Sequence, residues 1–314
     1  MRAKNFFIAY IIIIICYSAY SQNEPTQIAP FFMPKVVVAK TKYYVLTQGN
    51  SPSFRKIFKV KENILEDTSI VAYEFIATGG LFKKISTANF VRSMFGSAYL
   101  NGKIYVAGGF DNKGNYTNTF YEFDIGAKTW IKKTNMSKKR AYLALEAYNN
   151  KIYAIFGDQN NSIEVYDPLT AKWEILSVSY GNSKPLTNIT SSTIIDNKIY
   201  LFGNDGEFII FNISNLNIEK GIECPFKLRY FSVASSNRKI YLSAGCNTDN
   251  IDNTVYMLNT VTNEWVKAGK ISVDRCGSGL VFFGSMLIYL GGSSTNMYYE
   301  TTPVGEIFIY RPIF

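Results

Sequence analysis

The chain contains no histidine among its 314 residues. This absence excludes the Ser-His-Asp and Cys-His nucleophile systems, the commonest general base, and the imidazole ligands of most zinc and copper sites. Cysteine is scarce as well, with four residues and no Cys-x-x-Cys spacing, so a thiolate metal site is not supported. We therefore expect no metal and no other cofactor, and no catalytic residue can be assigned.

The chain also lacks an apolar run of the ~20 residues that a membrane-spanning helix needs. Its N-terminal apolar stretch, residues 6–16, is shorter, follows Arg2 and Lys4, and is followed by small residues. A basic start, a short apolar centre and small residues are the pattern of a signal peptide. We interpret residues 1–21 as that signal peptide and expect no stable membrane insertion.

The expected cleavage site lies just before Gln22, which predicts a secreted or periplasmic protein. Lipid attachment at Cys16 is the alternative, but Ile15 stands where a lipoprotein site needs a small residue. Plain secretion is therefore favoured over a lipoprotein anchor.

Acidic residues are fewer than basic ones. Removing residues 1–21 takes away Arg2 and Lys4 and no acidic residue, which lowers the formal net charge from +9 to +7. This charge favours anionic partners in a general way and serves solubility equally well. Because the positive charge is dispersed and the chain is expected to be exported, nucleic acid is not an expected partner.

Three cysteines remain after cleavage, namely Cys224, Cys246 and Cys276. An odd number in an oxidising compartment allows at most one disulfide and leaves one thiol. The sequence leaves the choice among the three pairings open.

Aromatic residues and glycine are abundant, with 16% aromatic residues and 22 Gly, a balance that favours short strands and turns. An apolar strand with a central tyrosine recurs at intervals of 41 to 48 residues, at Tyr105, Tyr153, Tyr200, Tyr241 and Tyr289, with a weaker copy at Tyr44. Repeats of this length are typical of the four-stranded blades of a β-propeller. The chain is therefore expected to be all-β.

A second landmark has a fixed spacing of seven residues in every unit. It joins the end of one strand to an aromatic or apolar position after a turn, in the pairs Phe75 and Phe82, Phe123 and Trp130, Tyr166 and Trp173, Phe211 and Ile218, and Leu258 and Trp265. A constant offset with varying residues indicates a shared backbone geometry. We expect a tight hairpin between the third and fourth strands of each blade.

The pattern resembles the kelch repeat, which Tyr105, Gly108-Gly109, Trp130 and Arg140 carry most completely. The resemblance extends over nearly all of residues 30–314, although several units lack the second glycine or the Trp. It implies a single six-bladed β-propeller, residues 22–314, with four antiparallel strands in each blade. The kelch-like copper radical oxidases depend on histidine ligands, so their chemistry is excluded here.

The last unit ends too early to hold a fourth strand, because its seven-residue position would fall beyond Phe314. A closed ring leaves no exposed sheet edge. We therefore expect an N-terminal strand at residues 27–32, just before an inner strand at Lys35–Ala39, to complete the last blade.

The first unit contains about a dozen extra residues, at about 49–69. They form either a binding loop at the mouth of the ring or merely a longer strand, and the sequence leaves both open because loops tolerate insertion cheaply.

Four arginines stand 12 to 14 residues before the strand tyrosines, at Arg92, Arg140, Arg229 and Arg275. Equivalent positions in a ring converge on one face, and in the proteins that this chain resembles such arginines line the mouth and some bind acidic ligands. A guanidinium offers paired donors to a carboxylate or sulfate. The alternative is structural, since an arginine at a strand start can also hold backbone carbonyls.

We predict an exported, monomeric, non-catalytic binding propeller that recognises an acidic glycan, a small anion or a protein partner through the arginine-bearing face. The alternative from the enzyme class is a mutarotase or epimerase of an acidic sugar such as sialic acid, because that chemistry needs only an arginine clamp and a carboxylate.

Overall fold

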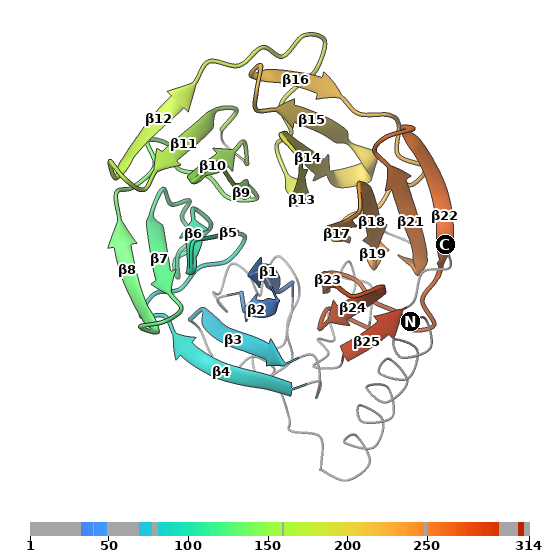
Figure 1. The fold of residues 1–314 in the computed structure, drawn as a ribbon, viewed down its shortest axis with the longest axis horizontal. Helices are drawn as coiled ribbons and strands as arrows, with labels where there is room; N and C mark the ends of the chain where they lie inside the picture. Colours follow the sequence, from blue (N-terminus) through green and yellow to red (C-terminus); the bar gives the residue numbers. More distant parts are fainter. Residues whose placement is uncertain are drawn as a thin grey trace, which may run out of the picture.

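The structure is a computed structural model that describes residues 33–39, 41–48, 69–76, 81–158, 160–247, 250–294 and 307–310. Antiparallel sheets stand around a central axis like the blades of a propeller (Figure 1). Within the described residues, the regular structure outside the strands is one 3-10 turn at Asn204–Gly206. The prediction of an all-β propeller is confirmed.

Five blades have four strands each, arranged as antiparallel meanders. Blades 1 and 2 consist of β1 (Lys35–Ala39), β2 (Lys42–Leu46), β3 (Val71–Ile76) and β4 (Leu81–Thr87), then β5 (Gly96–Leu100), β6 (Lys103–Ala107), β7 (Phe120–Asp124) and β8 (Thr129–Lys133). Blades 3 and 4 consist of β9 (Ala144–Tyr148), β10 (Lys151–Ile155), β11 (Ile163–Asp167) and β12 (Lys172–Leu176), then β13 (Ile189–Ile195), β14 (Lys198–Gly203), β15 (Phe208–Asn212) and β16 (Asn217–Lys220). Blade 5 consists of β17 (Ser232–Ser236), β18 (Lys239–Ser243), β21 (Thr254–Asn259) and β22 (Glu264–Lys270).

The count of complete blades differs from the prediction. The described residues form five four-stranded blades, not six, and these are followed by a three-stranded sheet of β23 (Gly279–Phe283), β24 (Met286–Leu290) and β25 (Ile307–Tyr310). Within the described residues, this sheet has no fourth strand. The closing strand expected at residues 27–32 lies outside the described residues.

The seven-residue spacing is explained by strand register. In each four-stranded blade the two residues of the pair face each other directly across the hairpin of the third and fourth strands, as Phe123 faces Trp130 and Tyr166 faces Trp173. The other three predicted pairs are also cross-strand partners. Such apolar pairs stabilise a sheet by roughly 0.2–1 kcal/mol each. The predicted hairpins are confirmed.

The second strand of each blade is buried on both faces, because it lies between two neighbouring blades. In β6, Ile104, Tyr105, Val106 and Ala107 are all at most 2% exposed. Tryptophans of the outer strands seal the flanks. Trp173 of blade 3 packs edge-on against Phe120 of blade 2, with 4.9 Å between the ring centroids. Burial of one such ring contributes roughly 2 kcal/mol or more.

The Gly108-Gly109 pair is required by a close approach of two backbones at the end of β6. Gly108 has a φ of +64°, and a Cβ atom there would lie 2.5 Å from the carbonyl oxygen of Arg140. Gly109 donates its N–H to the same carbonyl at 2.8 Å. Only glycine fits such a position without strain. The pair therefore fixes the turn that carries Arg140.

The one disulfide among the described residues joins Cys246 to Cys276. Cys246 belongs to the short hairpin of β19 (Gly245–Cys246) and β20 (Ile251–Asp252) in blade 5, whereas Cys276 precedes β23. The bond therefore links blade 5 to the sheet that follows it. Among the described cysteines, Cys224 is the one outside the disulfide; it is buried, and burial raises its pKa to about 12.

Two predictions fall on residues that the structure does not describe. The signal peptide at 1–21 and nearly all of the insertion at 49–69 lie outside the described residues. In the part of the chain that is described, no helix has the length and apolar character needed to cross a bilayer.

Candidate functional site

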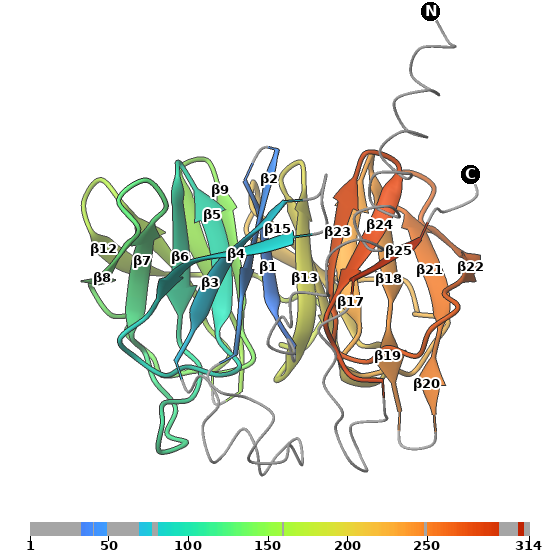
Figure 2. The ribbon, with the colours of Figure 1, turned by 90° about the horizontal axis from the view of Figure 1, so that it is seen from below.

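One edge of the ring, here called the loop face, carries two kinds of connection. It comprises the segments that lead into the inner strands (88–95, 134–143, 177–188, 221–231 and 271–278) and those between second and third strands (108–119, 156–158, 160–162, 204–207, 244–247 and 250–253). Isolated bridges such as Ser93 with Phe110 and Ala141 with Asp158 tie the two kinds together. The β19–β20 hairpin marks this face at the lower end of Figure 2.

The four predicted arginines occupy equivalent places on the loop face. Each lies three or four residues before the inner strand of its blade: Arg92 before β5, Arg140 before β9, Arg229 before β17 and Arg275 before β23. The surroundings of their guanidinium groups differ, however, and this difference decides what each can bind.

Arg140 is fully buried and its guanidinium contacts its own blade. It donates to the carbonyl oxygens of Phe156 at 3.1 Å and Ser162 at 2.9 Å, and it forms an ion pair with Glu164, which is also fully buried. Glu164 in turn accepts the backbone N–H of Ser137 at 2.7 Å. Burial lowers the pKa of Arg140, and the Glu164 carboxylate opposes that shift. These contacts correspond to the structural alternative, in which the arginine at a strand start holds backbone carbonyls rather than a ligand.

Arg92 and Arg275 are also buried. Arg92 donates to the Thr119 hydroxyl at 2.6 Å, and its guanidinium lies 5.6 Å from the ring centroid of Phe90. Arg275 donates to the carbonyl oxygen of Asp274 at 2.8 Å. Ligand contact by these two arginines stays a prediction, and their described contacts are internal.

Arg229 is the most exposed of the four. Its side chain is 37% exposed and forms a forked ion pair with Asp205, at 3.1 Å from Nε and 2.6 Å from an Nη atom. The paired donors of a guanidinium match one carboxylate in this geometry. The structure therefore places one predicted site residue, Arg229, where a partner can reach it.

Aromatic side chains gather beside these arginines, in a set we call the aromatic mouth: Phe110, Tyr116, Tyr142 and Tyr230. The ring of Phe110 lies 4.7 Å from that of Tyr116 and 5.9 Å from that of Tyr142, and the Tyr116 hydroxyl donates to Asp158. Burial and the neighbouring groups Tyr230, Tyr116 and Asp158 raise the pKa of Tyr142. The three tyrosines are half-buried, so part of each ring faces outward.

Backbone geometry holds the aromatic mouth in place. Met94, Tyr142 and Tyr230 each stand two residues before an inner strand and have φ values of 52°, 54° and 55°. Bulky residues adopt this left-handed conformation only where the surrounding structure imposes it. Met33, two residues before β1, has a φ of 45°, so one strained turn is used in blades 1, 2, 3 and 5. This turn was not predicted from the sequence, although a tyrosine follows two of the arginines closely: Tyr142 stands two residues after Arg140, and Tyr230 directly follows Arg229.

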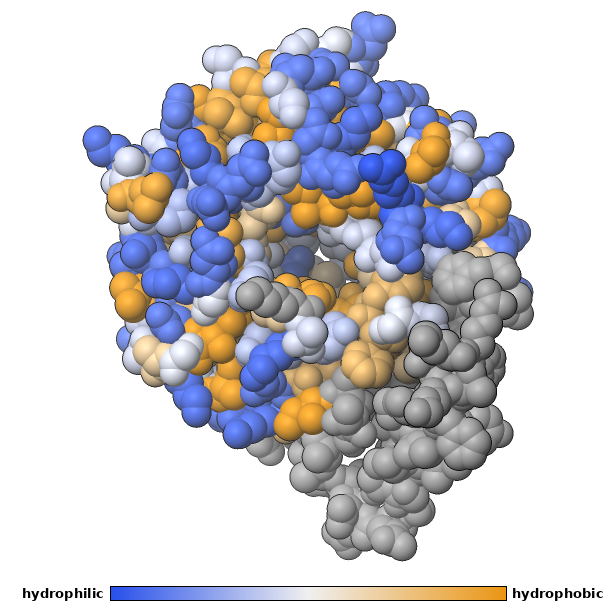
Figure 3. Space-filling view, viewed as in Figure 1, coloured by the Kyte–Doolittle hydropathy of each residue, from blue (hydrophilic) through white to orange (hydrophobic). Residues whose placement is uncertain are grey.

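A second candidate site is the axial cavity, about 460 Å³ in volume and lined by the six inner strands β1, β5, β9, β13, β17 and β23. Figure 3 shows the ring hollowed at its centre. Serine and threonine side chains line much of it; the Ser192 hydroxyl donates to Glu146 at 2.6 Å, and Thr193 bonds Ser235 at 2.7 Å. None of the four arginines is among its described lining residues.

Two charged side chains face this cavity, Lys35 of β1 and Glu146 of β9. Burial lowers the pKa of Lys35 to about 8, and nearby Glu146 opposes this. Burial raises the pKa of Glu146 to about 7, and the Ser192 hydrogen bond and Lys35 oppose that. The sequence analysis missed both residues. The signal was present, because they are the only charged residues in the six inner strands, all of which the structure describes.

Within the described residues, no group of three or more acidic or cysteine side chains is placed to hold a metal ion. The polar atoms of the axial cavity are hydroxyls, one carboxyl and one ammonium group. They suit hydrogen bonding and charge pairing with an organic ligand.

Comparison with known proteins agrees with the repeat pattern. The Kelch motif matches residues 92–137, 139–177 and 227–270, which are blades 2, 3 and 5 with the arginine that precedes each. These are the blades whose outer strand carries a Trp. Blades 1 and 4, with Phe82 and Ile218 at that position, are not matched. The fold and these matches together define a β-propeller with kelch repeats in blades 2, 3 and 5.

Two relatives illustrate the distance. The chain is 21% identical over 224 residues to Kelch-like protein 25 of Xenopus tropicalis, covering 64% of this chain and 37% of that protein. It is 23% identical over 254 residues to Kelch-like protein 40 of Xenopus laevis, covering 74% of this chain and 40% of that protein. The chain thus spans about two-fifths of the length of these relatives.

Proposed function

We propose that this chain is an exported, monomeric, non-catalytic propeller that binds a protein partner with its loop face. The observation that carries the proposal is the aromatic mouth, in which half-exposed tyrosines are held rigidly beside the exposed Arg229–Asp205 pair. Tyrosine and arginine are the residues that contribute most to protein interfaces, because they bury large areas at low entropic cost. Kelch-repeat proteins generally act as protein-binding propellers, which supports the same conclusion.

Export is supported by the signal peptide pattern and agrees with the Cys246–Cys276 disulfide, since such bonds persist in oxidising compartments. We also propose that the sheet of β23, β24 and β25 is a sixth blade, completed by a strand from residues 27–32. Its place in Figure 1, between blade 5 and blade 1, supports this closure.

Recognition of an acidic glycan or anion is supported at Arg229 rather than at all four arginines, because the described contacts of the other three are internal. The epimerase alternative needs an arginine clamp beside a carboxylate. The axial cavity has the carboxylate of Glu146, but its described lining contains no arginine. Protein binding is the better supported function.

The test is affinity capture from the native host with the mature chain as bait. We expect the replacements Tyr116→Ala and Tyr230→Ala together to reduce recovery of a specific partner by at least about tenfold. Ile175→Ala is the matched control, since Ile175 is an exposed apolar residue of β12 on the outer rim. Equal recovery with both variants would contradict the proposal, and loss with the control alone would place the interface on the rim.

A glycan array distinguishes the anion version. Binding of acidic glycans that Arg229→Ala abolishes would favour it, whereas an array without binding leaves the protein partner as the ligand of this face.

A further inference from the structure

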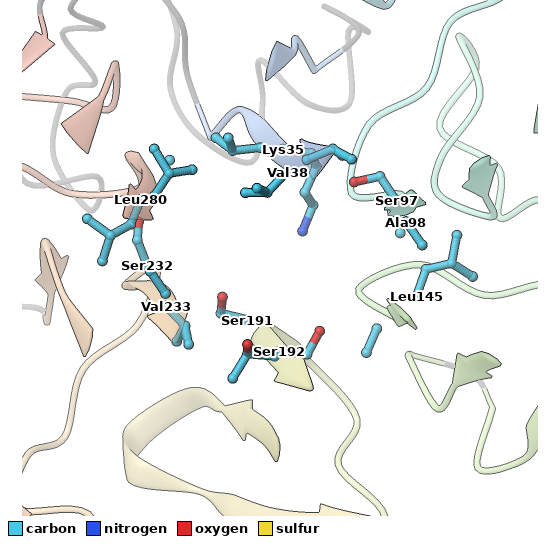
Figure 4. Close-up of a pocket in the computed structure, with 18 of the residues that line it drawn as sticks. Lys35, Val38, Ser97, Ala98, Leu145, Ser191, Ser192, Ser232, Val233 and Leu280 are labelled. Carbon is cyan, nitrogen blue, oxygen red and sulfur yellow. The ribbon is translucent and has the colours of Figure 1, made fainter. Parts of the chain in front are cut away.

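The axial cavity is lined by a positively charged side chain, that of Lys35, which has no role in the proposed function. Lys35 extends its ammonium group from β1 into the open space at the centre of the ring (Figure 4). Among the described residues, the ammonium group has no hydrogen bond and no ion pair. The charged group that acts on it from nearby is the carboxylate of Glu146. By contrast, Lys42 on the neighbouring strand β2 has a carboxylate partner, Glu74, at 2.7 Å. The cavity therefore contains a positive charge free to meet a ligand.

A negative charge faces the same space from a different blade. Glu146 lies on β9 and keeps one hydrogen bond, from the Ser192 hydroxyl. Glu146 and Lys35 form no direct ion pair, yet each is close enough to shift the pKa of the other. A gap thus separates two opposite charges inside one cavity.

We propose that the axial cavity binds a small zwitterion, with the ligand's carboxylate at Lys35 and its ammonium group at Glu146. A ligand with a single charge would be attracted by one of these side chains and repelled by the other. A ligand with both charges is attracted at both ends, which is electrostatic complementarity in its simplest form. The chemical class is a free amino acid or an ω-amino acid.

The remaining lining fits a ligand of this class. The hydroxyls of Ser97 and Ser191 are directed toward the same space and offer neutral donors and acceptors (Figure 4). Val38, Leu145 and Leu280 line other parts of the wall and suit an apolar side chain. A cavity of about 460 Å³ lies in the range that small-molecule sites occupy.

The two charged residues of this site lie on inner strands and outside the loop face, so the site is tested separately from the proposed partner binding. Its existence would mean that the propeller carries a small ligand while its loop face engages a protein.

The experiment is calorimetric titration of the mature chain at about pH 7.5, where Lys35 and Glu146 are both largely charged. The probes are the L-amino acids, β-alanine, 4-aminobutyrate and 6-aminohexanoate, and butyrate and butylamine are the matched single-charge controls. We expect at least one zwitterion to bind roughly tenfold or more tightly than either control.

Two substitutions localise the binding. Lys35→Met removes the cation, and Glu146→Gln removes the charge while keeping an acceptor for Ser192. We expect each to weaken zwitterion binding by roughly tenfold or more. Lys42→Met, on the neighbouring strand β2, is the control and should bind as the unaltered chain does, because Lys42 lies outside the cavity lining.

The proposal is overturned if no probe binds at about 20 mM, if butyrate or butylamine binds as tightly as the best zwitterion, or if both cavity variants bind normally. The comparison of zwitterions with single-charge probes uses the unaltered chain, so it decides the matter even if a variant fails to fold.

Discussion

Two pairs of opposite charges lie inside this ring, and they differ in one respect. Arg140 and Glu164 contact each other directly, and neighbouring backbone groups and the Ser162 hydroxyl make further hydrogen bonds to them. Lys35 and Glu146 face each other across an open cavity without contact. A charge that is buried and paired within the protein helps to hold the local geometry and is out of reach of a ligand. A partly buried charge that faces a cavity and makes no ion pair carries a desolvation cost that a ligand of opposite charge can relieve.

The largest expected effect on stability comes from breaking the buried Arg140–Glu164 ion pair. Arg140→Met should lower the free energy of unfolding by about 3–5 kcal/mol, because it leaves the Glu164 carboxylate buried and unpaired. Chemical denaturation measures the loss. The control is Arg238→Met, which removes an exposed ion pair with Asp196 and should change stability by less than about 1 kcal/mol.

Removing both charges of the pair separates the effect of the unpaired Glu164 carboxylate from that of the other lost contacts. The double change Arg140→Met with Glu164→Leu should recover part of the lost stability, since removing both charges ends the desolvation cost. A double variant no more stable than the single one would show that the lost contacts to Phe156 and Ser162, rather than the unpaired charge, explain the effect.

The Cys246–Cys276 disulfide links two segments of the loop face, whereas the described lining of the axial cavity contains no cysteine. Replacing both Cys246 and Cys276 by Ser should lower the free energy of unfolding by about 3–4 kcal/mol, because the bond closes a loop with a sequence separation of 30 residues. Reduction with dithiothreitol should reproduce the loss in the unaltered chain. Cys224→Ser is the control; a reductant that left the melting temperature of the unaltered chain unchanged would contradict the pairing.

Lys35 and Glu146, which form no ion pair, make the stability of the fold depend on pH. The pKa of Glu146 is raised from 4.5 to about 7, so the folded chain binds its proton more tightly than the unfolded chain does. Stability from this group is therefore full below about pH 4.5 and is lost as the pH rises through about 7. Lys35 has the opposite effect, since its lowered pKa makes stability rise between about pH 8 and 10.5.

Glu146→Gln should remove the loss at neutral pH. We expect the variant to exceed the unaltered chain in unfolding free energy by on the order of 1–3 kcal/mol near pH 8 and to match it near pH 4.5. Tyr99 and Tyr230 are the other titratable groups in the described lining, and both are unchanged in the variant. A difference between the two proteins that stays constant with pH would rule out the titration of Glu146 as its cause.

The smallest effect on stability is expected at the exposed pair. Arg229→Gln should cost less than about 1 kcal/mol, because solvent screens an ion pair whose side chains are 37% and 50% exposed. Partner binding should nevertheless fall several-fold. Thermal denaturation and partner titration of the same sample separate the two; a large loss of stability would show that Arg229, like Arg140, has a structural role.

Local features of the fold were predictable because they depend on neighbours in sequence. The seven-residue spacing predicted the outer hairpins, since a tight turn of constant length fixes which residues face each other, and the inner strand Lys35–Ala39 was placed with its observed bounds. The partners of the arginines were not predictable. Glu164 meets Arg140 from a strand 24 residues later, and the choice of Cys246 and Cys276 over the other pairings depends on how two neighbouring sheets meet.

The axial charges were hidden for a different reason. A one-residue change of register would turn Glu146 away from the cavity, so its orientation depends on the whole blade rather than on the strand itself. The partners of the arginines and the charges in the cavity were unpredictable for the same reason. Sequence spacing gives the position of a residue in a blade, whereas packing decides what its side chain contacts.

The three tryptophans provide built-in optical probes. Trp130, Trp173 and Trp265 stand at equivalent outer positions of blades 2, 3 and 5, and the chain has only these three. Intrinsic fluorescence therefore reports on blades 2, 3 and 5 and on the blades against which they pack; the ring of Trp265, for example, lies 6.2 Å from that of Phe208 in blade 4. Chains that keep one tryptophan each would show whether the blades unfold together or one after another.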